Sequence, residues 1–277
     1  MNKKLLPFLL LATLIALVGC QVQAPTPTPT PTQPDPTATV AAPTPAPQIT
    51  PEVEEPALPD EAIMILSPGS GSRVTNPIRL SGEANSTFEQ NLVIRVLQDD
   101  GVLLLETHTT IQAEMGQRGP FEAEFNLPLE EERNVFIQVL DVSARDGGVT
   151  HLSSVGLMFS PTGPEEIVVR TPQPEQIVIF TPQMRDTLRG GVVVVEGFGW
   201  ASFEQTLVVE VYDGNNTMIG QTPVMVQSLE HGVPGPFQAE VAYTLAAPGS
   251  GRVVVRDISP AHGDSSHVSS VEVQLEP

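Results

Sequence analysis

The stretch Ser86–Val96, STFEQNLVIRV, decides the fold because it occurs twice: Ala201–Val211 reads ASFEQTLVVEV, 115 residues later. Four further pairs of landmarks keep this spacing, with offsets of 114 to 116 residues. These pairs are Ser67-Pro68 with Thr181-Pro182, Gly82 with Gly197, Gly119-Pro120-Phe121 with Gly235-Pro236-Phe237, and His151–Val155 with His267–Val271. Repetition at a fixed spacing indicates a tandem duplication. We expect two homologous domains, 62–160 and 175–277, joined by a linker over 161–174.

Within each copy, apolar residues alternate with polar ones. The alternating apolar positions are Phe121, Ala123, Phe125 and Leu127 in the first copy and Phe237, Ala239, Val241 and Tyr243 in the second. A period of two is typical of strands with one buried face and one wet face. Turn signals such as Asp146-Gly147-Gly148 separate the short strands, without a convincing amphipathic helix between them. About 100 residues with about seven strands favour an all-β fold of two tandem immunoglobulin-like β-sandwich domains. A small β-barrel is the alternative.

The same landmarks resemble the immunoglobulin-like domain of bacterial spore germination. Its pattern has an opening strand that ends in Ser/Thr-Pro, a Gly-x-Ala segment leading to Phe-Glu and an apolar strand, and a Gly-Pro-Phe turn. Gly82–Glu89 fits this pattern, whereas the second copy has Gly199 in place of the alanine and Trp200 in place of Asn85. The resemblance covers both domains. It implies extracytoplasmic, non-catalytic modules and, more distantly, a link to spore germination.

Residues 1–20 read as a lipoprotein signal peptide. Lys3 and Lys4 precede an apolar run from Leu5 to Val18, which is too short for a comfortable membrane span. Leu17-Val18-Gly19-Cys20 resembles the lipobox of bacterial lipoproteins, and Cys20 is the only cysteine. The resemblance implies cleavage before Cys20 and a diacylglycerol on its sulfur. We therefore expect an extracytoplasmic, membrane-anchored lipoprotein of the cell envelope that contacts the membrane through the lipid on Cys20.

Composition constrains the rest of the chain. Residues 21–61 are rich in proline and threonine and are predicted to form a disordered stalk, since such a segment buries too little apolar surface to fold. The 277-residue chain carries a net charge of -20 and has no lysine beyond Lys4. It therefore lacks the lysine of a P-loop or a Schiff base. Its acidity argues against nucleic acid as a partner.

The linker contains a shorter repeat. Glu166–Gln173, EIVVRTPQ, is followed by Gln176–Gln183, QIVIFTPQ, whose alignment with the first copy makes 177–181 the opening strand of the second domain. The earlier segment is either an extended linker or an extra strand that pairs with a sheet edge and stiffens the junction. We favour the extended linker because four prolines lie between 161 and 174.

His151 and His267 lie beside serines, with Asp146 and Asp264 not far away. Hydrolysis by a serine nucleophile also needs an exposed serine and an oxyanion site, and the chain has no nucleophile elbow before a helix. Strand periodicity places His267 in line with the apolar residues that follow it. We therefore expect the histidines to make structural hydrogen bonds at the polar mouth of an inward face.

Other polar features have simpler interpretations. The acidic turns Asp99–Gly101 and Asp213–Asn216 lack the ligand spacing of a calcium loop and suit hairpin turns. The repeated Glu89 and Glu204 have no second carboxylate at a fixed spacing, so we expect them to brace a turn rather than transfer protons. The sequence thus predicts no catalytic residue, no cofactor and no metal site.

Trp200, the only tryptophan, is the candidate interaction residue. It could anchor a ligand, contact the other domain, or cover the end of its own sandwich. Together these features predict a non-enzymatic, lipid-anchored cell-surface protein that presents two immunoglobulin-like domains to a protein or cell-envelope partner. The alternative is an envelope module that binds carbohydrate or peptidoglycan.

Overall fold

The computed structural model describes residues 57–228 and 230–277, so the leader with Cys20 and most of the proline-rich stalk lie outside the described residues. The first half contains β1 (Ile63–Ser67), β2 (Arg73–Val74), β3 (Ile78–Ala84), β4 (Asn91–Gln98), β5 (Leu103–Thr110), β6 (Gly119–Phe125), β7 (Arg133–Val142) and β8 (Val149–Phe159), with a 3-10 turn η1 (Phe88–Gln90) before β4. The second half contains β9 (Ile177–Thr181), β10 (Thr187–Leu188), β11 (Val192–Gly199), β12 (Thr206–Asp213), β13 (Met218–Met225), β14 (Gly235–Ala242), β15 (Gly249–Ile258) and β16 (Ser265–Leu275). Each strand of the first half thus has a counterpart eight strands later.

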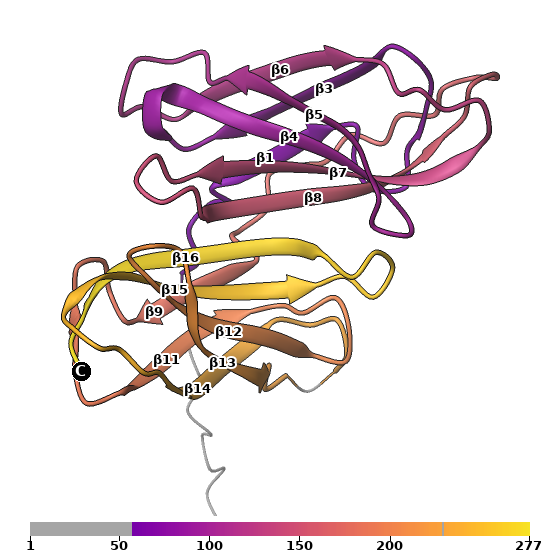
Figure 1. The fold of residues 1–277 in the computed structure, drawn as a ribbon. Coiled ribbons are helices and arrows are strands. Elements are labelled where there is room, and N and C mark those ends of the chain that lie inside the picture. The colour runs from indigo at the N-terminus through magenta and orange to yellow at the C-terminus, as the bar shows by residue number, and fades with distance from the viewer. Residues whose placement is uncertain (1–56, 229) are drawn as a thin grey trace, which may run out of the picture. The chain divides into compact units, whose positions relative to one another are not determined.

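Each half is a two-layer sandwich (Figure 1). A three-stranded sheet, β1-β3-β6 or β9-β11-β14, packs on the four strands β8-β7-β4-β5 or β16-β15-β12-β13. Two separate apolar cores fill the layers, one around Phe121 and Ile137 and the other around Phe237 and Val253. The prediction of two immunoglobulin-like sandwiches is confirmed, and the barrel alternative is wrong because the layers are separate sheets.

The two sandwiches share one sheet. Strand β8 pairs antiparallel with β16, so the larger layers join into a single path β13-β12-β15-β16-β8-β7-β4-β5. An edge strand exposes unpaired backbone groups, and here each sandwich covers an edge of the other. The described residues, 57–228 and 230–277, accordingly belong to one compact unit.

The segment 165–174 is extended and hydrogen-bonded to the first sandwich. Gly69 N donates to Val168 O at 2.7 Å, and Arg170 N donates to Leu66 O at 2.9 Å. Arg73 and Glu166 exchange backbone hydrogen bonds of 2.9 and 3.0 Å. The segment therefore follows the edge of the first domain, as the alternative of an added strand requires, although it is too irregular to count as one.

The repeated Phe-Glu-Gln segment forms a left-handed turn in both halves. Glu89 and Gln90 have φ angles of 54° and 57°, and their counterparts have 48° and 55°. The glutamine, rather than the glutamate, braces the turn: buried Gln90 donates through Nε2 to Glu114 O at 2.9 Å and to Gln117 O at 3.1 Å. Glu89 is exposed. The preceding Phe88 and Phe203 are 62% and 49% exposed, so they do not contribute to the cores.

No helix among the described residues is long and apolar enough to cross a membrane.

Gly82 and its counterpart Gly197 have a packing role that predicts the effect of substitution. A Cβ on Gly82 would lie 2.2 Å from Met64 O and 2.4 Å from Phe121 Cζ. We expect Gly82→Ala to lower the free energy of unfolding by roughly 1–3 kcal/mol, because the added methyl overpacks a strand pair that cannot yield. Urea denaturation measures the change. Gly249→Ala is the control, because its Cβ meets nothing within 4 Å. Equal stabilities for the two variants would contradict the packing role.

Candidate functional site at the junction of the domains

The junction has an approximate two-fold symmetry that follows from the duplication. In the β8–β16 pair, Leu152 lies opposite Val268, which is its own counterpart in the other half. Exchanging the two halves also exchanges the neighbouring pairs, His151 with Ser269 and Ser153 with His267. The same patch of each domain therefore faces the other, which is the arrangement of an isologous interface.

The hydrogen bonds at the junction also come in pairs that are related by exchanging the two halves. Glu61 N donates to Gln173 O at 3.2 Å, and Glu175 N donates to Pro59 O at 2.8 Å. Two side-chain hydrogen bonds of 2.7 Å are related likewise, Ser154 Oγ to Ser266 O and Ser270 Oγ to Thr150 O. The approach to β1 and the approach to β9 thus pair with each other, as β8 and β16 do.

A buried cluster of polar side chains lies beside the approximate two-fold axis that relates the two domains. His267 Nε2 is 2.6 Å from Glu175 Oε1, and His151 Nε2 is 3.5 Å from Glu175 Oε2. The two imidazole rings meet edge to face, with centroids 5.1 Å apart. Ala62 N donates to Glu175 Oε2 at 2.7 Å. One carboxylate of the second domain therefore lies between the two duplicated histidines.

Glu61, the counterpart of Glu175, has a different environment. It accepts a hydrogen bond from the Ser153 hydroxyl, and its Oε2 lies 3.6 Å from Arg170 Nη2. Its Oε1 lies 4.0 Å from His267 Nδ1. The side chains of Glu61 and Glu175 are only 4% and 7% exposed, so both carboxylates are held within the protein.

Burial and neighbouring groups shift the pKa values of His151, Glu175 and Glu61 in different directions. Burial lowers the pKa of His151 to about 4, against the opposing charge of Glu175, so this imidazole is neutral at neutral pH. Burial alone would raise the pKa of Glu175, but the two histidines and the Ala62 amide outweigh it and hold that pKa at about 2. Burial raises the pKa of Glu61 above its usual value. The two glutamates thus titrate differently although they are counterparts.

The sequence placed the histidines on the correct strand face but missed their partners. Val273 and Leu275, in line with His267, do belong to the core, yet the mouth of that face is closed by the other domain. The sequence alone does not identify Glu61 and Glu175 as partners of the histidines. The signal was present, because both precede the opening strand at the same 114-residue spacing as the Ser/Thr-Pro landmarks.

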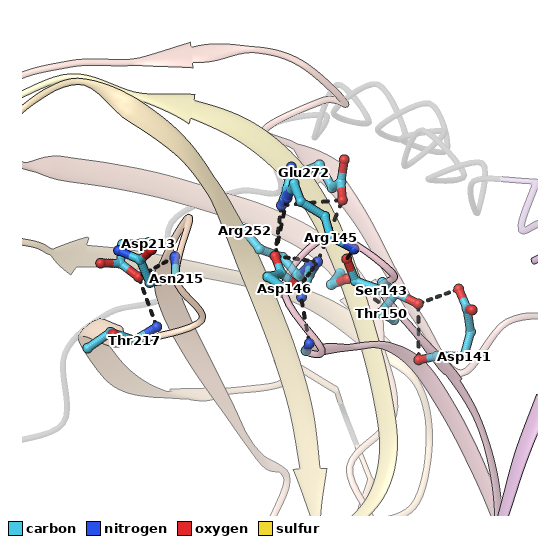
Figure 2. Close-up of polar contacts among 12 residues, drawn as sticks. Asp141, Ser143, Arg145, Asp146, Thr150, Asp213, Asn215, Thr217, Arg252 and Glu272 are labelled. Carbon is cyan, nitrogen blue, oxygen red and sulfur yellow. Dashed lines mark hydrogen bonds and ion pairs between the residues drawn. The ribbon is translucent and has the colours of Figure 1, made fainter. Parts of the chain in front are cut away.

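Asp146 and Asp264, which lie near the histidines in the sequence, accept hydrogen bonds from other groups. Asp146 accepts from Arg252 Nη2 of the second domain at 3.0 and 3.1 Å and from Arg145 Nη2 at 2.9 Å (Figure 2). Arg252 is 1% exposed, and Gly148 leaves room for it, since a Cβ there would lie 2.2 Å from Arg252 Nη1. Asp264 accepts from the Ser265 amide at 2.6 Å. Neither contact forms a serine–histidine–aspartate arrangement.

At the symmetry-related position, two aromatic rings stand in place of the Arg252–Asp146 ion pair. The counterparts of Arg252 and Asp146 are Phe136 and His262, whose ring centroids lie 4.4 Å apart at an angle of 54°. Burial lowers the pKa of His262, which favours the neutral ring against Phe136. The two ends of the junction are thus closed by different chemistry.

The acidic turns use their carboxylates locally. Asp213 Oδ1 accepts from Asn215 N and Thr217 N, each at 2.9 Å, as Figure 2 shows. Asp100 Oδ1 accepts from Val102 N at 3.1 Å. Such contacts are typical of hairpin turns.

Trp200 lies at a cleft beside the junction. The cleft has a volume of about 310 Å³, and its lining includes Trp200, Phe198, Arg170, Glu61 and Glu175. Trp200 is 40% exposed, and its backbone exchanges hydrogen bonds with Gln176 at 3.1 and 3.2 Å. The structure therefore fixes the backbone of Trp200 while part of its indole stays open to solvent.

The Asp146–Arg252 pair predicts a pH-dependent stability. We expect Asp146→Asn to lower the free energy of unfolding at pH 7 by roughly 3 kcal/mol, because it removes the closest carboxylate from the buried Arg252 and leaves Glu272, at 3.5 Å, as its ion-pair partner. Burial raises the pKa of Asp146, but Arg145, the Gly148 amide and Arg252 lower it to about 2. Because the folded pKa lies below the unfolded one, the stabilisation is present above about pH 4 and is lost as the pH falls towards 2.

Urea denaturation of both proteins between pH 7 and pH 2 measures this difference, which should close at the acidic end. Arg145→Ala is the control, since it removes a partly exposed partner of the same carboxylate and should cost less than about 1 kcal/mol. A pH-independent gap between wild type and Asp146→Asn would show that the pair does not stabilise through its charge.

Comparisons with known proteins give weak likenesses and one family. No curated protein matches the chain. Red sea bream transglutaminase is 7% identical over 78% of this chain and 31% of its own, with a TM-score of 0.27. Dimeric latent PorU from Porphyromonas gingivalis is 15% identical over 78% of this chain and 20% of its own, with a TM-score of 0.27. The periplasmic chaperone SfaE is 13% identical over 76% of this chain and 98% of its own, with a TM-score of 0.23. This chain thus spans less than a third of the first two, and at these TM-scores the likenesses carry no argument.

The model of the immunoglobulin-like domain of bacterial spore germination matches this chain twice, over residues 62–148 and 176–264. Each match falls on one of the two sandwiches and contains its repeated landmarks from Ser/Thr-Pro to Gly-Pro-Phe, whereas His151–Val155 and His267–Val271 lie beyond the matched ranges. The chain therefore belongs to the family of immunoglobulin-like domains of bacterial spore germination.

Proposed function

We propose that this protein is a lipid-anchored, extracytoplasmic binding protein that presents its two immunoglobulin-like domains as one unit to a protein of the cell envelope. The observation that carries the proposal is the partly exposed Trp200 at a cleft of about 310 Å³ beside the domain junction. Membership of a family of immunoglobulin-like domains supports binding rather than catalysis.

The lining of the cleft suits a protein partner. Its apolar part includes Leu58, Phe198 and Pro234, and Arg170 adds a cation. Tryptophan and arginine are enriched among the residues that dominate binding energy, especially where apolar neighbours exclude water around them. A short segment of a partner with an apolar side chain would match the apolar lining, which lies beside the ion pair of Arg170 with Glu61.

The shared sheet supports the same proposal. Because β8 and β16 pair directly, the domains need not be ordered relative to each other when a partner binds. Binding sites that are already organised lose less conformational freedom on association. This matters for the cleft because residues from both domains line it, and their relative positions are already fixed before a partner binds.

Carbohydrate binding is the second candidate, and the same cleft favours it in one respect. An indole next to the side chains of Gln173 and Gln176 offers a stacking surface with hydrogen-bonding groups. A glycan of the cell wall would use both.

Anchoring through Cys20 predicts a change of compartment. We expect the full chain to enter the detergent phase when a bacterium that processes lipoproteins expresses it, because acyl chains on Cys20 add apolar surface. Cys20→Ser should remove the acyl groups from the peptide that carries residue 20, because serine has no sulfur to hold the lipid. Phase partition with mass spectrometry measures both. A wild-type peptide that carries Cys20 without acyl groups would rule out lipidation.

The role of the cleft predicts a selective loss of binding. We expect Trp200→Ala to lose at least about tenfold in affinity for the partner captured from envelope extracts, as expected for a binding hot spot. Phe88→Ala is the matched control, because Phe88 is also an exposed aromatic but does not line the cleft. Capture followed by a binding titration measures the effect. Equal binding by both variants would exclude the cleft, and retention on purified peptidoglycan that depends on Trp200 would favour the glycan.

A further inference from the structure

Three potential metal ligands converge in the buried cluster. His151, Glu175 and His267 bring one ligand atom each within 4.8 Å of one another, and no other such group of three occurs in residues 57–228 and 230–277. The ligands come from β8, from the start of the second domain and from β16. Two imidazoles and one carboxylate form a ligand set that zinc uses when a water completes the fourth position.

The cluster leaves buried nitrogen atoms without partners. His151 Nε2 and His267 Nδ1 are shielded from solvent and have no hydrogen-bond partner. Buried polar atoms in folded proteins are nearly always paired, so each such exception calls for a missing partner. A cation beside Glu175 would supply that partner for His151 Nε2, which faces this carboxylate at 3.5 Å.

Glu61 occupies the position of an outer carboxylate. It lies 4.0 Å from His267 Nδ1, while the other ring nitrogen, Nε2, faces Glu175. Metal-bound histidines typically donate their second N–H to a carboxylate, which fixes the tautomer and the ring orientation. The Ser153 hydroxyl and Arg170 in turn hold Glu61 in place.

The cleft beside the cluster offers a path for an ion and a water. Glu61 and Glu175 both contribute to its lining. The cleft therefore extends to two residues of the cluster, whose side chains are only 4% and 7% exposed.

From this arrangement we infer that His151, Glu175 and His267 bind one divalent transition-metal ion, zinc by ligand type, at the junction of the two domains. The site goes beyond the proposed function and does not depend on it. It also departs from the sequence-based expectation of no metal, because the ligands are distant in sequence and meet only through the β8–β16 pairing. The ion would connect a ligand from the first domain to two from the second.

The test titrates Zn²⁺ into the full chain carrying Cys20→Ser, which lacks the only thiol, after removal of metals with EDTA. Calorimetry should give one site with a dissociation constant in the micromolar range or tighter. At about 100 times that concentration, the melting temperature should rise by roughly 5–10 °C, because the ion binds the folded state. Co²⁺ should give the visible absorption of a low-symmetry site with nitrogen and oxygen ligands.

Variants assign the ligands. His151→Ala and Glu175→Gln should each weaken Zn²⁺ binding by at least tenfold, and Glu61→Gln by about 10–100-fold. His231→Ala is the matched control, since it removes an exposed histidine and should change nothing. If the ligand variants do not fold, the wild-type titration still decides. Absence of saturable binding, or equal affinity in wild type, His151→Ala and Glu175→Gln, would overturn the inference and leave an adventitious ion only.

Discussion

The antiparallel pairing of β8 with β16 is the contact on which the other features of the junction depend. Its register is fixed by both faces of the shared sheet. On one face Leu152 and Val268 pack with Leu140 and Val254, and on the other the histidines and serines meet the two glutamates. A shift of one residue would exchange the faces of the shifted strand and place its histidine and serine side chains against the apolar cluster. The polar cluster, the buried arginine and the cleft all require this one register.

The sequence was sufficient to predict each sandwich but not their union. Period-two patterning identifies which face of a strand is buried, as at Phe121 and Phe237, and the duplication doubles that signal. It carries no information on which edge strand finds a partner, so the shared sheet and the convergence of Glu61 with Glu175 were not predicted. Repetition alone does not identify a core residue: Phe88 and Phe203 precede a left-handed turn in both halves, and both are exposed.

The two ends of the junction show that a symmetric backbone arrangement accepts different side-chain pairs at equivalent positions. Arg252 with Asp146 at one end and Phe136 with His262 at the other occupy equivalent places, yet one pair is ionic and the other aromatic. A change at one member alone would leave Arg252 without its closest carboxylate, or one ring without the other. The same divergence separates Glu61 from Glu175: one is bound by a serine and an arginine, and the other lies between the histidines.

The approximate two-fold axis also bears on how such a chain arises. A self-complementary surface on a single domain is the surface of a homodimer, whose population depends on protein concentration. Joining two copies through the segment 161–174 makes the same contact intramolecular, with a high effective concentration that dilution cannot reduce. Once the halves are encoded separately, a substitution no longer appears twice in the interface. Trp200, which stands where the first half keeps Asn85, is the kind of one-sided addition that a symmetric dimer could not have made in a single copy.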